Sequence, residues 1–203
     1  MFIQSPAKVP DQLQTDEFII RPIEVNDAEA DYEAVMESRE FLRLWEQSSW
    51  PEDDFTLEEN RKDVEKLVER HASGHSFAFT VLTPDETRCL GCIYVFPNDA
   101  GMFVRSEISP RDSNAWVDVS AANYFWVRKS ELKSGLDQRL LRHLADWFKS
   151  KWKFKQPVFV TNQQYDQQVT MFEQAQLSLQ FEINDPNAEG KFLAYGIRSP
   201  SPV

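Results

Sequence analysis

Residues that could hold an anion gather between Arg128 and Asp137. This stretch reads Arg-Lys-Ser-Glu-Leu-Lys-Ser-Gly-Leu-Asp and contains one glycine, Gly135. The apolar run 115–127 before it predicts a strand, and the leucines and aromatics of 136–149 recur at helical spacing. A strand, a glycine loop and a helix N-terminus can bind an anion, because free amides and the helix dipole converge there. The same pattern is typical of an ordinary strand-to-helix connection.

A second chemical motif is Cys89-Leu90-Gly91-Cys92, with His71 and His75 upstream. Two thiols and two imidazoles could form a zinc site. Cysteines three residues apart on a strand point to opposite faces, however, unless Gly91 makes a bulge. We therefore expect buried structural cysteines and no metal.

The elements that would position these motifs can be predicted along the chain. We expect a strand over 18–23, a helix beginning near Asn26 and Glu29, and a second helix that Thr56 and Glu59 cap and Gly74 ends. Alternation over 77–81 and the run 89–96 predict an antiparallel hairpin.

The later part of the chain shows a different pattern. We expect a strand piece at Phe103-Val104, a loop over 110–114, and a strand over 157–161 that the crossover helix makes parallel to the strand before Arg128. A helix from Asp166 and two strands, 179–183 and 192–197, complete the core. We expect the tail 199–203 to be disordered.

Composition limits the class of protein. The chain has 203 residues, 41% of them hydrophobic, which favours a single domain over 1–203 with its core at about 17–197 and a short N-terminal lead-in. A formal charge of −11 opposes binding to nucleic acid and to anionic membrane surfaces. Neither a signal-peptide pattern nor a membrane-length apolar run is found, so we expect a cytoplasmic protein.

The order of elements, with the phrases 18–22, 124–128 and 171–173, resembles the GNAT superfamily of acyl-CoA N-acyltransferases over residues 17–196. The chain is most similar to the branch that acetylates the N-termini of ribosomal proteins. The resemblance implies an α+β fold with α/β/α layers. Its mixed, mostly antiparallel sheet of about seven strands would splay between strands 4 and 5, flanked by about four helices.

The resemblance also implies a site for acetyl-CoA as co-substrate, along the strand before Arg128 and the loop after it. The residues it assigns to the cofactor are Trp126, Val127, Arg128, Leu132, Lys133, Ser134, Gly135, Leu136, Asp137 and Asn162. Of the family's loop pattern only Gly135 agrees, because Leu132 lacks a polar head and Asp137 places a carboxylate where pyrophosphate would lie. Ser134 and Asp137 are also spaced as a capping box, which would occupy the amides that bind phosphate.

Acid and base residues are less clear. The positions at which relatives carry a tyrosine acid and a glutamate fall on Phe172 and near Ala122, which cannot transfer protons. We therefore name Asp118, expected on the long strand, as a candidate base and Tyr165 as a candidate acid. The alternative for Asp118 is a solvated carboxylate on a strand, and the alternative for Tyr165 is a surface tyrosine at a helix start. Neither alternative has a catalytic role.

The sequence thus supports an N-acetyltransferase that transfers the acetyl group directly from acetyl-CoA to an amine of a small molecule or a protein N-terminus. The alternative is a catalytically inactive module of the same fold that binds a ligand or peptide. It is motivated by the departures at Leu132, Asp137, Ala122 and Phe172. A homodimer is compatible with either hypothesis.

Overall fold

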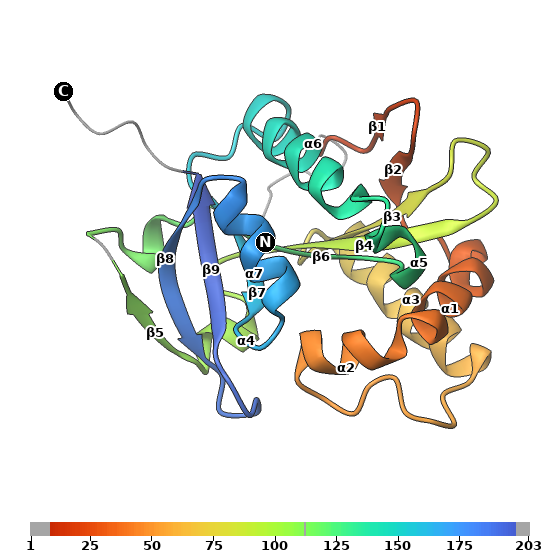
Figure 1. Cartoon of the computed structure of the whole chain (residues 1–203), viewed down its shortest axis with the longest axis horizontal. Helices are drawn as coiled ribbons and strands as arrows, with labels where there is room; N and C mark the ends of the chain where they lie inside the picture. The colour runs from red at the N-terminus through yellow and green to blue at the C-terminus, as the bar shows by residue number, and fades with distance from the viewer. Residues whose placement is uncertain (1–8, 112, 198–203) are drawn as a thin grey trace.

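A nine-stranded sheet forms the centre of the computed structural model, which describes residues 9–111 and 113–197 (Figure 1). The strands are β1 (Leu13–Gln14), β2 (Ile19–Pro22), β3 (Phe77–Leu82), β4 (Cys89–Phe96), β5 (Glu107–Pro110), β6 (Ala121–Val127), β7 (Pro157–Asn162), β8 (Leu177–Asn184) and β9 (Phe192–Ile197). The helices are α1 (Ala28–Glu37), α2 (Arg39–Glu46), α3 (Leu57–Ser73), α4 (Gly101–Val104), α5 (Lys129–Leu132), α6 (Leu136–Ser150) and α7 (Asp166–Gln174), with 3-10 turns η2 (Val25–Asp27) and η3 (Trp116–Asp118). The tail predicted to be disordered lies outside the described residues.

The strands lie in the order β1-β2-β3-β4-β6-β7-β9-β8-β5. Every neighbouring pair is antiparallel except β6 and β7, which are parallel because α6 crosses between them. The mixed, mostly antiparallel sheet and the α+β class are therefore confirmed. The sheet has nine strands where about seven were expected, because the short edge strands β1 and β5 were not predicted.

Helices cover the β1–β6 half of the sheet on both faces. In Figure 1, α6 lies along one side of it and α1, α2 and α3 lie along the other. The buried apolar face of α6 packs with Phe79 and Phe125 in one core cluster, whereas Ala78 and Trp126 pack with α1, α2 and α3 in another. Neighbouring residues thus face opposite layers, as the period of a strand requires.

Local signals account for both ends of α3. Thr56 caps α3 with a reciprocal hydrogen bond to Glu59, and Gly74 ends it in the left-handed conformation at φ 69°, both as predicted. Helix α1 begins at Ala28, close to the predicted start, but Asn26 and Glu29 do not form its cap. Glu24 and Asp27 form the capping box instead, and Asp27 also pairs with Arg21 at 2.8 Å.

Two segments differ from their predicted form. The long strand does not begin at Ala115, because 116–118 form η3 and β6 starts at Ala121. Residues 101–104 form the helix α4 rather than a strand piece, and β5 follows at Glu107–Pro110, where Pro110 ends an edge strand. Pairing with β8, which is distant in sequence, positions β5.

Among the described residues, no helix has the length and apolar character needed to cross a membrane.

Candidate active site

The sheet opens between β6 and β7. Their parallel ladder ends at the pair Asn123 and Phe159, while β6 stays paired with β4 as far as Val127. Residues 124–127 therefore have strand β4 on one side and no paired strand on the other. When the unpredicted strands β1 and β5 are left out of the count, β6 is the fourth strand and β7 the fifth. The predicted opening between the fourth and fifth strands is therefore confirmed.

On one face of the opening lies a hollow of about 400 Å³ between the start of α6 and helix α7, which we call the α6–α7 hollow. Leu132, Asp137, Gln138, Asp166, Gln167, Thr170, Met171 and Gln174 line it. Two of these residues are acidic and none is a lysine or arginine, so the hollow as described disfavours an anion.

The nearby cations face elsewhere. Lys133 is exposed and is not among the residues lining the α6–α7 hollow. Arg139 donates to Glu17 at 2.7 Å and to the Ser134 carbonyl oxygen at 2.6 Å. These side chains therefore do not offset the two carboxylates in the hollow.

The loop before α6 is tied to α1. Residues 129–132 form the short helix α5, and its amide N–H groups at Lys129 and Ser130 donate to Ser38 Oγ and Glu37 Oε1 at 3.0 and 2.9 Å. Arg128 Nε donates to Glu37 Oε2 at 2.6 Å. Desolvation opposes ionisation of Glu37, but the bonds from Ser130 and Arg128 outweigh it and lower its pKa to about 2.

The capping box expected from Ser134 and Asp137 is not formed. Gly135 begins α6 with φ at 72°, a conformation that glycine adopts without strain, and Ser134 donates to the Glu131 carbonyl oxygen. Asp137 is buried, and its Oδ1 accepts from the Gln138 amide at 2.9 Å. A carboxylate thus still stands at the helix start, where the helix dipole stabilises it.

The opposite face carries a larger hollow of about 650 Å³, which we call the aromatic hollow. Its aromatic lining includes Trp45, Trp50, Tyr94, Phe103, Tyr124 and Phe192. Tyr124 is the first residue of β6 beyond the paired segment, so this hollow borders the opening of the sheet. An Arg105–Asp185 ion pair at 2.6 Å also lines it.

Burial changes the ionisable groups of the aromatic hollow. Desolvation raises the pKa of Tyr94 and of Tyr124, so both phenols stay protonated. Packing around its carboxylate raises the pKa of Glu46, although the residue as a whole is exposed. Glu46 accepts one hydrogen bond, from Ser48 at 3.0 Å. A carboxylate of raised pKa beside aromatic rings suits proton transfer with a bound amine.

Tyr165 and Asn162 lie where β7 leads into α7. Tyr165 is 9% exposed, and its ring stacks on Phe41 of α2 with centroids 5.7 Å apart, so the surface alternative is wrong. Burial and then the charge of Asp137 raise the pKa of Tyr165. Asn162 donates to the Leu44 carbonyl oxygen and accepts from the Gln164 amide, so both ends of its side-chain amide have partners.

Asp118 does not lie on the long strand, where its predicted role as the base would place it. It is exposed, belongs to η3 rather than to the long strand, and lines neither hollow. Glu107 is likewise exposed, on the edge strand β5, and lines neither hollow. The positions aligned with relatives' acid and base residues, Phe172 and Ala122, are fully buried in the core.

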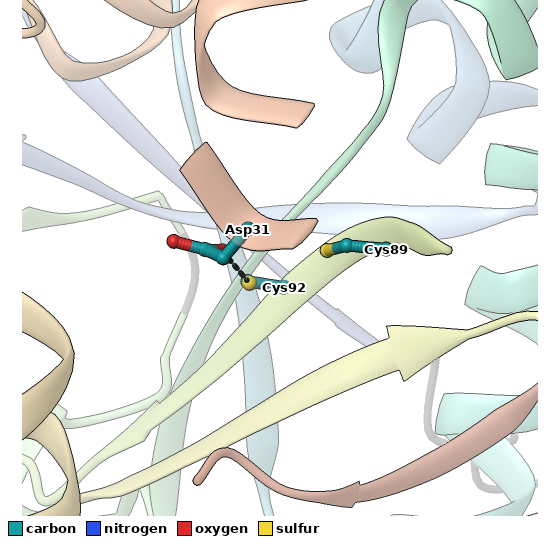
Figure 2. A group of neighbouring side chains, drawn as sticks. All are labelled: Asp31, Cys89 and Cys92. Atoms are coloured by element: carbon teal, nitrogen blue, oxygen red, sulfur yellow. Dashed lines mark hydrogen bonds between the residues drawn. The ribbon is translucent and has the colours of Figure 1, made fainter. Parts of the chain in front are cut away.

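The Cys-x-x-Cys motif forms a buried group with Asp31 of α1, and none of the three residues lines either hollow (Figure 2). One ligand atom from each of Asp31, Cys89 and Cys92 lies within 4.8 Å of the others. Cys92 Sγ donates to Asp31 Oδ1 at 3.2 Å, and Asn60 Nδ2 donates to Asp31 Oδ2 at 3.0 Å. Desolvation raises the pKa of Asp31.

A bulge in β4 brings the two cysteines to one face. Val81 pairs with Gly91 but Leu82 pairs with Cys89, so Leu90 is the extra residue. Gly91 has φ at 155°, and a Cβ there would lie 2.1 Å from the Trp126 carbonyl oxygen, so only glycine fits. The prediction that Cys89 and Cys92 point to opposite faces of the strand is therefore wrong. The bulge that was named as the exception to this prediction is present.

The histidines do not complete a zinc site. His71 Nδ1 contacts the Ala78 carbonyl oxygen at 3.0 Å and its ring packs on Phe79, while His75 Nδ1 contacts Ser73 Oγ at 2.8 Å. Cys89 and Cys92 are free thiols, 0% and 1% exposed. Burial of both thiols agrees with their predicted structural role.

Two polar residues of the site were not predicted from the sequence. Gln168 lies four residues before Phe172 and therefore shares its buried helical face, and its Nε2 donates to the Phe125 carbonyl oxygen at 2.9 Å. A glutamine on an apolar helix face was the available signal. Glu46 follows Trp45 in an acidic, aromatic segment and gave no comparable signal.

The parallel β6–β7 pair that opens beyond Asn123, with α6 following β6, agrees with the splayed sheet that the resemblance to GNAT acyltransferases implies. No protein-family model and no curated protein matches the chain in sequence. Solved structures do match, at TM-scores of 0.67. Ribosomal-protein-S5-alanine acetyltransferase from Vibrio fischeri is 14% identical, with 94% of this chain and 97% of that one covered. RimL, a ribosomal L7/L12 alpha-N-protein acetyltransferase in complex with coenzyme A, is 12% identical, with 92% and 97% covered. The microcin C7 self-immunity acetyltransferase MccE, in complex with acetyl-CoA and AMP, is 10% identical, with 95% and 98% covered. At sequence identities of 10–14%, the similarity to these structures establishes the fold of this chain and nothing beyond it.

Proposed function

We propose that the chain is an acyl-CoA-dependent N-acetyltransferase that acts on an amine of a small molecule or of a protein N-terminus. The observation that carries this proposal is the opening of the sheet beyond Asn123 and Phe159, with a hollow on each face. A donor and an acceptor could reach the β6 edge from opposite sides. The solved structures of RimL and MccE, which contain CoA and acetyl-CoA respectively, support the choice of donor.

The residues of the opening suit the acceptor half of the reaction. The aromatic hollow offers ring faces to an ammonium group, and Glu46 can take its proton before the free amine attacks the thioester carbonyl. Tyr165, buried and protonated, can supply a proton to the departing thiolate. Placing two substrates side by side accounts for much of the rate of such a transfer.

The chain suits the extended arm of CoA better than it suits the pyrophosphate. The unpaired edge of β6 can hydrogen-bond an extended arm, with the backbone of Trp126, Val127 and Arg128 as the proposed contact. The segment 132–137, proposed for the pyrophosphate, instead contributes Leu132 and Asp137 to an acidic hollow. We therefore propose weak binding of CoA by this chain, with no metal involved.

The second candidate is a ligand- or peptide-binding module without catalysis. Asp137 and Asp166 in the α6–α7 hollow favour it, because two carboxylates repel a pyrophosphate, and the engaged side chain of Asn162 adds to this. The aromatic hollow would then be the binding site.

Thermal unfolding with increasing acetyl-CoA or CoA distinguishes the two candidates. Donor at about 100 times its Kd should stabilise the fold by about 2.7 kcal/mol. Release of CoA thiol in the presence of amines and of peptides with free N-termini then tests transfer. A donor-induced shift with amine-dependent thiol release supports the enzyme. No shift at millimolar CoA overturns it and leaves the binding module.

The remaining assignments belong to the same proposal. A formal charge of −11 supports an acceptor that is not nucleic acid and a protein that does not bind anionic membranes. We propose a cytoplasmic location and allow for a homodimer. Analytical ultracentrifugation tests the dimer.

A further inference from the structure

Tyr124 lies at the centre of the rings that line the aromatic hollow. Its ring contacts those of four other lining residues, with centroids 5.8–6.5 Å apart: Trp45, Phe96, Phe103 and Phe192. These side chains come from α2, β4, α4, β6 and β9, so distant parts of the chain assemble one aromatic surface. Such a surface favours a ligand with a large apolar or aromatic part, because the ligand then removes both apolar surfaces from water.

Most polar side chains that line the aromatic hollow already have partners in the protein. Gln47 accepts from the Gly190 amide and donates to the Lys191 carbonyl oxygen at 3.4 Å. Ser106 donates to the Met102 carbonyl oxygen at 2.6 Å. The lining therefore offers few free partners to the amide groups of a peptide, and an amide buried without a hydrogen bond is costly. This favours a small molecule over a protein N-terminus.

The charges that line the aromatic hollow are three acidic and three basic side chains. Two ion pairs form among them, Asp63 with Lys66 at 2.9 Å and Asp185 with Arg105 at 2.6 Å. Glu46 and Arg70 remain without an ion pair in the part of the chain that the structure describes. Arg70 is exposed to water, whereas desolvation of the Glu46 carboxylate raises its pKa. The charge that Glu46 lacks is therefore a cation beside the aromatic rings.

We propose that the aromatic hollow binds a small primary amine with an aromatic or bulky apolar body, whose ammonium group pairs with Glu46, and that this amine is the acetyl acceptor. The inference rests on the proposed function and narrows its acceptor. In the transfer the ammonium gives one proton to Glu46, the nitrogen bonds the acetyl carbon, and the carbon–sulfur bond breaks with its electron pair on sulfur. The nitrogen then loses its second proton and the thiolate gains one, which yields the amide and CoA thiol.

Calorimetric titration of the full chain, without donor and again with CoA, measures binding of the acceptor apart from transfer. The probes are phenethylamine, ethylamine, the uncharged analogue phenethyl alcohol, and trialanine as a short peptide. Glu46→Gln removes the charge at constant size, and Tyr124→Leu removes the central ring. Glu52→Gln is the matched control, because it makes the same change at an exposed position that does not line the aromatic hollow. Circular dichroism verifies that each variant is folded.

Phenethylamine should bind about 30-fold more tightly than ethylamine, the gain from burying one phenyl group, and more tightly than trialanine. Glu46→Gln should weaken phenethylamine about tenfold and leave phenethyl alcohol within about twofold, because the alcohol carries no charge. Tyr124→Leu should weaken both ligands about fivefold, and Glu52→Gln should change neither.

If trialanine binds as tightly as phenethylamine, or is the better acceptor in thiol release, the inference is wrong and the proposed function stands. Equal weakening of amine and alcohol by Glu46→Gln shows a structural effect and also overturns the inference. So does a wild type that binds no probe with or without CoA. A chain that prefers phenethylamine but binds no CoA overturns the proposed function and the acceptor role, while the amine site stands.

Discussion

Asp137 Oδ2 accepts a hydrogen bond from Gln167 Nε2 at 3.2 Å and thereby joins the start of α6 to α7 across the α6–α7 hollow. Its other oxygen accepts from the Gln138 amide, so the carboxylate is fixed at a helix N-terminus, where an anionic ligand would otherwise bind. One residue thus decides whether this end of the hollow attracts or repels phosphate.

We expect Asp137→Asn to increase the affinity for CoA about tenfold, or about 1.4 kcal/mol, because it removes a negative charge and keeps an acceptor for Gln167. Calorimetry at low and high salt measures both the gain and its screening. Asp166→Asn, an exposed carboxylate lining the same hollow, is the control and should have the smaller effect. Unchanged affinity in Asp137→Asn, with a wild type that binds CoA, would show that Asp137 does not limit binding.

The contact of Glu37 with Arg128 predicts a pH dependence of stability. The pKa of Glu37 in the folded protein, about 2, lies below its ordinary value of 4.5. Its contribution is therefore complete above pH 4.5 and is lost as the pH falls from 4.5 toward 2. We expect Glu37→Gln to lower the free energy of unfolding at pH 7 by about 1–2 kcal/mol, a value reduced for solvent screening.

Urea unfolding of wild type and Glu37→Gln between pH 7 and pH 2.5 measures this difference. It should shrink steadily below pH 4.5, the ordinary value of the group. Glu40→Gln is the matched control, because Glu40 pairs with the neighbouring Lys129 at 2.9 Å but is exposed, and it should change stability little. A difference that stays constant with pH would mean that shape, and not charge, explains the effect of the Glu37 substitution.

Local patterns predicted much of this fold. The hairpin of β3 and β4, the cap at Thr56 and the crossover helix α6 each depend on neighbours in sequence, and all three are present. Features set by distant contacts were not predicted. Asp118 left the strand because 116–118 turn before Ala121, and the bulge at Leu90 depends on pairing with β3.

In the candidate site, too, some features could be predicted from the sequence and others depend on contacts between residues distant in sequence. The opening of the sheet and the position of the loop followed from the family resemblance, whereas the bond from Gln168 to Phe125 joins residues that no local pattern relates. Tyr165 was a candidate by its place at a helix start. Its burial depends on stacking with Phe41, which lies in a segment whose contacts could not be predicted.

Asp31 gives a prediction of opposite sign to that of Glu37. Burial raises its pKa above the ordinary 3.8, so the folded state binds the proton more tightly than the unfolded state does. The free energy of unfolding should therefore fall as the pH rises above 3.8, by about 1.4 kcal/mol for each pKa unit of the shift.

Asp31→Asn keeps an acceptor for Asn60 and removes the ionisable group, so its stability relative to wild type should increase with pH. Urea unfolding from pH 4 to pH 8 provides the measurement, and Asp146→Asn, an exposed position on α6, is the control. In the same samples Cys89 and Cys92 should react with a thiol reagent only on unfolding, since both are buried. A pH-independent difference between the variants would contradict the buried, proton-binding carboxylate.

Tyr165 can be tested as the proton donor to the departing thiolate. Tyr165→Phe removes the hydroxyl and retains the stacking on Phe41, so the fold and the affinity for CoA should change little. We expect kcat to fall about 10²-fold, the lower end of the range for a lost general acid. Steady-state kinetics at saturating donor, with CoA affinity from calorimetry, separates the two effects. Tyr195→Phe, on β9, is the control, because Tyr195 is buried as well but belongs to a different core cluster, and it should keep kcat within about twofold. If Tyr165→Phe retains full kcat, another group or solvent protonates the thiolate. If kcat and CoA affinity fall together, Tyr165 supports the site structurally and is not its acid.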